Sequence, residues 1–345
     1  MFEAIVMLCA GLAGAPPCRA ALVPGYEAAS LAGCEAALEA HPVAGAECRT
    51  AGEALAVTEV APGVFVHRGA VAEPDGENRG DTANLGFVIG AAAVAVIDSG
   101  SAAWMGEALW RAIRARSDLP VTHLVLTHVH PDHVLGASVF AGAEIVAHAG
   151  LPQALARRRE TYLQRFEALI GAEGFLGTEV PGIDLEVAER ARLDLGGRVL
   201  DLRAWPQAHS GTDLTVLDRA TGTLFAGDLV VAEHIPPLDG SLRGWQRVLG
   251  ELEQIPATRV VPGHGGPVSG GSVSGGAVLD WPEGAAPVRR YLGVLAREAA
   301  AAVAAGERLS EAVTHIAARE RAQWQLFDVF NARNATVAFT ELEWE

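Results

Sequence analysis

Three histidines and an aspartate lie close together in the segment 127–133, Thr-His-Val-His-Pro-Asp-His, which follows an apolar run that predicts a strand. Alternate residues at a strand end point to the same side, so His128 and His130 can bind one metal. Asp132 and His133 follow the turn and can reach a second metal nearby. Imidazole and carboxylate ligands suit zinc, with iron and manganese as alternatives.

Further candidate ligands follow three other short apolar segments. His209 comes after the run 198–204, Asp228 ends the sequence Phe-Ala-Gly-Asp, and His264 lies in the turn Pro-Gly-His-Gly. Each residue alone is as typical of a turn as of a ligand. Together with the first motif, they predict a site for two metals in which Asp228 bridges both.

The order of these motifs over residues 54–266 resembles the metallo-β-lactamase superfamily. The resemblance implies an α+β fold, the αββα sandwich, with the site at one edge of its two sheets. It implies that one metal is bound by His128, His130 and His209. The other metal would be bound by Asp132, His133 and His264, and both would share Asp228. It also gives Asp98 a supporting role, in which its hydrogen bonds hold the ligand loops.

The ligand set predicts a zinc-dependent hydrolase. Two metals about 3.5–4 Å apart hold a bridging hydroxide and polarise a carbonyl or phosphoryl oxygen. Asp132 is the expected catalytic residue, because it can orient that hydroxide. The substrate is expected to be a small molecule.

Three kinds of hydrolase compete. Many β-lactamases of this superfamily have cysteine where Asp228 stands and bind substrate with a lysine, and this chain has no lysine. Thioester hydrolases share the aspartate but differ around His264. The segments 73–87, 234–245 and 331–345 resemble the SoxH-like quinoprotein relay system zinc metallohydrolases. That likeness implies an exported accessory of a quinoprotein dehydrogenase that uses pyrroloquinoline quinone (PQQ), or of a c-type cytochrome system.

Two alternatives belong to other classes. Iron in such a site could oxidise persulfides, and the chain could instead be a periplasmic binding protein that keeps its metals as structure. The formal net charge of −16 disfavours nucleic acid as a partner. No segment is long and apolar enough to predict a membrane span.

The N-terminal region predicts export to the periplasm or beyond. Residues 1–20 are expected to be a signal peptide, because a short apolar stretch precedes small residues and prolines. Cleavage after Ala20 would leave Cys34 and Cys48, which would pair in an oxidising compartment; two free thiols are the alternative. Residues 21–53 then form a short helical extension, and residues 54–345 form the hydrolase domain with C-terminal helices.

Three residues are candidates for substrate contacts. Arg79 and Arg243 could bind an anionic group, and Trp245 could lie near the mouth of the site. The competing interpretations are solvated arginines and a tryptophan that packs its helix. The run Arg157 to Arg159 predicts a solvated helix face.

Overall fold

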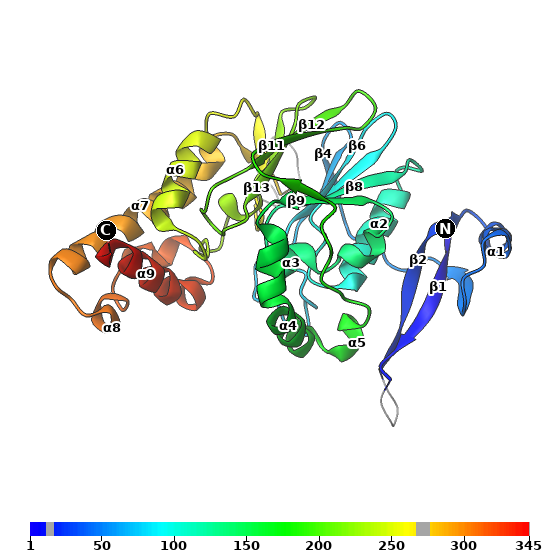
Figure 1. The fold of residues 1–345 in the computed structure, drawn as a ribbon, viewed down its shortest axis with the longest axis horizontal. Coiled ribbons are helices and arrows are strands. Elements are labelled where there is room, and N and C mark those ends of the chain that lie inside the picture. The colour runs from blue at the N-terminus through cyan, green and yellow to red at the C-terminus, as the bar shows by residue number, and fades with distance from the viewer. Residues whose placement is uncertain (12–16, 267–276, 345) are drawn as a thin grey trace.

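The computed structural model describes residues 1–11, 17–266 and 277–344. Two sheets lie face to face with helices on their outer sides (Figure 1). A small N-terminal sheet lies at one end of the molecule, and the C-terminal helices lie at the other (Figure 1). The predicted α+β sandwich is confirmed.

The first large sheet has seven strands in the order β10-β9-β8-β7-β6-β5-β4. The pairs from β4 to β7 are antiparallel, and the pairs from β7 to β10 are parallel. The strands are β4 Thr58–Ala61, β5 Val64–His67, β6 Leu85–Ile89, β7 Val94–Ile97, β8 Val121–Leu126, β9 Glu144–His148 and β10 Leu185–Val187.

The second large sheet has six strands in the order β11-β12-β13-β14-β15-β16. Only the pair β14 and β15 is parallel among these described strands. The strands are β11 Arg190–Asp194, β12 Val199–Ala204, β13 Leu214–Asp218, β14 Thr223–Phe225, β15 Arg259–Val261 and β16 Leu279–Asp280.

The helices cover both outer faces and form the C-terminal end of the molecule (Figure 1). They are α2 Ala103–Arg114, α3 Pro131–Val134, α4 Leu151–Ile170, α5 Ala172–Phe175, α6 Leu242–Leu252, α7 Ala286–Ala304, α8 Leu309–Ala312 and α9 Phe327–Glu343. Short 3-10 turns lie at Ala137–Phe140, Gly227–Leu229, Glu283–Ala285 and Ala318–Gln323. No helix among the described residues is long and apolar enough to cross a bilayer.

Three apolar layers hold the sandwich together. Val88, Val125 and Val216 belong to the layer between the sheets. Leu124 packs in the layer beneath α2 and α4, and Trp245 packs in the layer beneath α6, α7 and α9. Strands buried on both faces explain the continuous valine- and leucine-rich runs of the sequence.

The fold gathers the polar motifs at one edge of the sheets. Asp98 follows β7, and the 127–133 motif follows β8, its parallel neighbour. Asp228 and His264 follow β14 and β15, which are also parallel neighbours. Carboxyl ends of parallel strands lie at the same edge of a sheet, so these loops meet there.

The N-terminal region is a three-stranded sheet in the order β2-β1-β3, with one helix. Its elements are β1 Phe2–Cys9, β2 Cys18–Ala28, α1 Leu31–Ala40 and β3 Ala46–Thr50. Disulfides join Cys9 to Cys18 and Cys34 to Cys48. The second pair was predicted from the sequence, and the first was not.

The expected signal peptide is part of this sheet, apart from residues 12–16, which lie outside the described residues. Strand β1 pairs with both β2 and β3. The buried Glu3 accepts two hydrogen bonds from Arg111 of α2, at 2.8 and 2.9 Å. Residues 1–20 thus contribute β1 and the closest carboxylate partner of Arg111, and cleavage after Ala20 stays a prediction.

Glu3→Ala should destabilise the protein by about 3 kcal/mol, because it removes the closer of the two carboxylates beside the buried Arg111 guanidinium. Chemical denaturation measures the free energy of unfolding. The matched control is Glu39→Ala, at an exposed position of α1. Equal stability of the two variants would mean that β1 is not docked on α2.

Candidate metal centre

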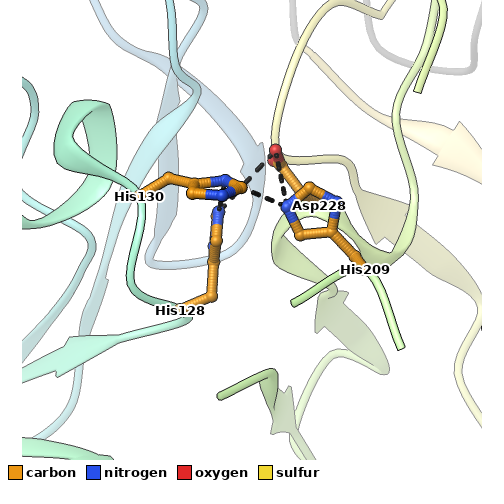
Figure 2. Close-up of side chains that lie close together, drawn as sticks. All are labelled: His128, His130, His209 and Asp228. Carbon is orange, nitrogen blue, oxygen red and sulfur yellow. Dashed lines mark hydrogen bonds and ion pairs between the residues drawn. The ribbon is translucent and has the colours of Figure 1, made fainter. Parts of the chain in front are cut away.

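Three histidines and one aspartate converge on a single point, each from a different loop or loop position (Figure 2). The inward-facing nitrogens are Nε2 of His128, Nδ1 of His130 and Nε2 of His209. The Nδ1 of His130 lies 3.0 Å from the first nitrogen and 3.1 Å from the last. An Asp228 carboxylate oxygen lies 3.7 and 3.5 Å from the Nε2 atoms of His128 and His209.

A second cluster adjoins the first and consists of Asp132, His133 and His264. The Nε2 atoms of its two histidines are 3.3 Å apart. The Asp132 carboxylate lies 3.9 Å from Nε2 of His133 and 3.4 Å from Nε2 of His264. The seven residues predicted as ligands therefore lie in two adjoining groups, divided as the superfamily resemblance implies.

Asp228 belongs to both clusters. Its Oδ1 lies 3.4 Å from His133, and its Oδ2 lies 3.4 Å from His264 and within 3.7 Å of the first cluster. Oδ1 is buried and has no hydrogen-bond partner in the described part of the chain. A buried carboxylate oxygen without a partner is costly unless a cation meets it.

The spacing of these atoms fits metal ions. A tetrahedral zinc with ligands at about 2.0–2.1 Å separates neighbouring ligand atoms by about 3.3 Å. The ligand atoms that lie closest together in the two clusters are 3.0 to 3.9 Å apart, and within each cluster all of them lie within 4.8 Å of one another. Imidazole lone pairs that face each other this closely repel, and a cation between them would relieve the repulsion.

The outer ring nitrogen of every ligand histidine has an oxygen partner. The Nδ1 atoms of His209 and His264 each donate to a backbone carbonyl at 2.8 Å. The Nδ1 of His128 donates to Thr127 Oγ1 at 3.1 Å, and the Nε2 of His130 contacts Asp239 at 3.3 Å. Such partners fix the tautomer, which leaves a lone pair on each inward nitrogen.

Asp98 carries out the supporting role that the resemblance implied. Its carboxylate accepts hydrogen bonds from the backbone N–H of Thr127 at 2.7 Å and from the Thr127 hydroxyl at 2.8 Å. It also accepts one from Nδ1 of His133 at 2.8 Å. Its backbone is left-handed, with φ of 59°, a conformation in which Asp is several-fold enriched. One side chain thus orients the start and the end of the His-rich motif.

The loop that carries His264 is held by Asn84. The Asn84 side-chain amide donates to the carbonyls of Pro262 and Gly265, both at 2.8 Å. A Cβ at Gly263 would lie 1.9 Å from Oδ1 of Asp228. The position therefore needs glycine for steric reasons.

Electrostatics differ between the clusters. Burial lowers the pKa of His128 well below its usual range and lowers that of His209 to about 3. Burial also acts on His133 and His264, but nearby carboxylates outweigh it and raise both pKa values. Burial would raise the pKa of Asp228, but the surrounding imidazoles hold it well below its usual range.

A cavity of about 520 Å³ opens on the metal centre. Four of the ligands line it: His130, Asp132, Asp228 and His264. Its outer wall comes from α4 and α9, whose lining residues the sequence analysis did not assign to the site. Among them are Arg157, Arg158, Tyr162, Arg165, Phe166, Phe330 and Arg333. The α4 residues recur at intervals of three or four, but a helical row alone does not show what it faces.

The three substrate candidates lie away from this cavity. Trp245 is fully buried; its ring packs 5.2 Å from that of His209, and its Nε1 donates to the Leu229 carbonyl. Arg79 stacks 4.4 Å over the Trp104 ring beside the N-terminal sheet. Arg243 lies in the first turn of α6, where its backbone N–H donates to Glu341. Trp245 supports a ligand, and none of the three lines the site. Arg157 and Arg159 are exposed, as the predicted solvated face implies, and Arg157 and Arg158 also line the cavity.

The profile of the metallo-beta-lactamase superfamily matches residues 78–264. The chain belongs to that superfamily. A curated relative, metallo-beta-lactamase domain-containing protein 1 of Xenopus laevis, is 26% identical over 175 residues, which are 48% of this chain and 63% of the relative. The match thus spans less than two thirds of the length of that relative.

Two solved structures share the fold of this superfamily member. A metallo-beta-lactamase from Pontibacter korlensis is 22% identical with a TM-score of 0.52, over 69% of this chain and 99% of that one. A stereoselective inverting sec-alkylsulfatase from Pseudomonas sp. is 16% identical with a TM-score of 0.60, over 83% of this chain and 50% of that one. The chain therefore has the hydrolase-type fold of the superfamily with a His/Asp metal-binding cluster.

Asp228→Ala should lower the bound metal from two ions per chain to one or none, because the bridging carboxylate belongs to both clusters. Elemental analysis after dialysis against limiting zinc measures the content. Asp118→Ala, at an exposed position after α2, should keep both ions. Two ions retained with unchanged affinity in Asp228→Ala would contradict the bridging role.

Metal affinity should depend on pH more strongly at the second cluster. Histidine binds metal in its neutral form, and the raised pKa values of His133 and His264 mean that metal must displace protons there. Affinity at this cluster should rise with pH until the raised pKa values are passed, by up to roughly ten-fold per pH unit for each proton displaced. The first cluster, with its lowered pKa values at His128 and His209, should change little near neutral pH. Chelator competition titrations measure both slopes, and equal slopes would contradict this difference.

Proposed function

We propose that the protein is a hydrolase that works with two zinc ions on a small-molecule substrate. The observation that carries the proposal is the buried Asp228 carboxylate, which has an unpartnered oxygen between two groups of inward-facing ligand atoms. A bridging carboxylate favours two metals over one. When bound, such a pair lowers the pKa of a shared water towards neutrality and polarises a carbonyl or phosphoryl oxygen.

Asp132 is the residue placed to handle the proton of that water. Its carboxylate lines the cavity, whereas the ligand histidines His128, His133 and His209 are buried beneath it. Thr82 Oγ1 donates to it at 3.4 Å, which helps to fix its orientation. The surrounding imidazoles lower its pKa despite burial, so it stays ionised near neutral pH and can accept a hydrogen bond or a proton.

The fixed tautomers contribute through preorganisation. Each ligand imidazole is held by an outer hydrogen bond, so the lone pairs need no reorganisation when metal binds. The fully buried Trp245 packs against His209 and shields this ligand from water. These contacts support a rigid metal centre below a cavity open to substrate.

We also propose that the protein is exported and serves a PQQ-dependent quinoprotein or c-type cytochrome system. Two disulfides in the N-terminal sheet support export, because such bonds persist in oxidising compartments. The link to a quinoprotein is supported by the sequence resemblance of segments 73–87, 234–245 and 331–345. β-Lactam and thioester hydrolysis are the competing activities within the same chemistry.

Zinc-loaded protein should turn over at least one substrate in a panel of chromogenic β-lactams, thioesters and lactones. Asp132→Asn at saturating zinc should lower kcat by about a hundred-fold, because the attacking water loses its proton acceptor. Asp118→Asn is the matched control, and metal content is measured for each variant.

A single bound iron with oxygen consumption would contradict the hydrolase and support a persulfide-type oxygenase. Metal-loaded protein that is inert on the whole panel, but co-purifies with a quinoprotein dehydrogenase, would support a non-catalytic binding protein instead.

A further inference from the structure

Positive charge is concentrated at the metal cavity of an otherwise acidic chain. The formal net charge is −16, yet four arginines line this one cavity: Arg157, Arg158, Arg165 and Arg333. Besides metal ligands, the carboxylates that line it are Glu73 and Asp239. With the ligands Asp132 and Asp228 included, four carboxylates balance the four arginines, so bound metal ions would make the cavity net positive.

Two of the arginines are already engaged. Arg158 of α4 contacts Asp239 at 3.1 Å, and Arg333 of α9 pairs with the other oxygen of the same carboxylate. Asp239 also contacts the outer nitrogen of His130 at 3.3 Å. These two arginines thus join two walls of the cavity to a ligand histidine, and their charge is offset by one carboxylate.

The other two arginines have no protein partner. Neither Arg157 nor Arg165 forms an ion pair with any described residue, and both are exposed on α4. Thr161 lies between them, at a spacing of four residues on each side, and also lines the cavity. Residues at this spacing share a helix face over about 12 Å, so two guanidinium groups and a hydroxyl face the same space.

An apolar row runs beside this polar one. Tyr162, Phe166 and Leu169 of α4 line the cavity at helical spacing. Leu326 and Phe330 line it from the beginning of α9. Tyr162 keeps its proton near neutral pH, because burial raises the pKa of its phenol. The cavity therefore offers an apolar slot with a cationic edge above the metal centre.

We propose that the substrate is an apolar acyl compound that also carries a free carboxylate. Arg157 and Arg165 bind the carboxylate, the apolar row holds the body, and the labile acyl bond lies at the metals. Guanidinium groups suit carboxylates because they donate paired hydrogen bonds in one plane. The substrate assignment rests on the proposed hydrolase, whereas the charge selectivity of the cavity does not.

Isothermal titration of octanoate and octanamide into zinc-loaded protein tests that selectivity without turnover. Octanoate should bind about ten-fold more tightly than octanamide, since hydrogen bonds between charged groups are stronger than neutral ones. The double variant R157Q/R165Q should weaken octanoate about ten-fold and leave octanamide unchanged. R159Q is the matched control, because Arg159 is exposed on the same helix and does not line the cavity.

A hydrolysis arm compares mono-4-nitrophenyl glutarate with neutral 4-nitrophenyl butyrate. The glutarate ester should have the higher kcat/KM, and R157Q/R165Q should raise its KM and spare the butyrate. Octanoate binding that is unchanged in R157Q/R165Q would overturn the proposal, since the metals alone would then hold the anion. Turnover without charge selectivity would also overturn it, while leaving the hydrolase intact. Selective binding without turnover of either ester would support the arginine site and count against the hydrolase.

Discussion

The fold depends on one constraint: five imidazoles must turn a lone pair towards two adjacent points inside the protein. Each does so because its other ring nitrogen is held by an oxygen, from Thr127, Asp239, Asp98 or a backbone carbonyl. Those oxygens come from different segments of the chain, so the convergence of the ligands depends on the sandwich fold. The buried Asp228 completes the convergence, and its close approach to the chain at 263 leaves room only for glycine.

This constraint explains why the remaining layers are arranged as they are. The parallel pairs β7–β8 and β14–β15 bring four ligand-bearing or supporting loops to one edge. Helix α6 places Trp245 against His209. Helices α4 and α9 form the outer wall of the cavity above the metal centre. Asp239 contacts Arg158 and Arg333 of that wall and also His130, so the same carboxylate positions two arginines and a ligand histidine.

The sequence predicted the ligands well because their signal is local: metal-binding residue types directly after apolar strands, in a recognisable order. The sequence did not predict contacts between residues that lie far apart along the chain. The apolar stretch at 2–9 is as typical of a leader as of a strand, so the signal peptide stays a prediction, and the pairing of Glu3 with Arg111, far along the chain, was not foreseen. The arginines of α4 were predicted as a solvated face, and several are exposed, but a helical row does not reveal that it also lines a cavity shared with α9. Trp245 could be a substrate contact or a helix-packing residue on its sequence alone, and its burial in the core supports the packing role.

X-ray absorption spectroscopy of zinc-loaded protein tests the central claim most directly. The account predicts two zinc ions per chain, bound by imidazole nitrogens and carboxylate oxygens, with a metal–metal distance of about 3.5–4 Å. Asp228→Asn should weaken that metal–metal signal. A single zinc bound by His128, His130 and His209, with no second metal at any zinc concentration, would contradict the account.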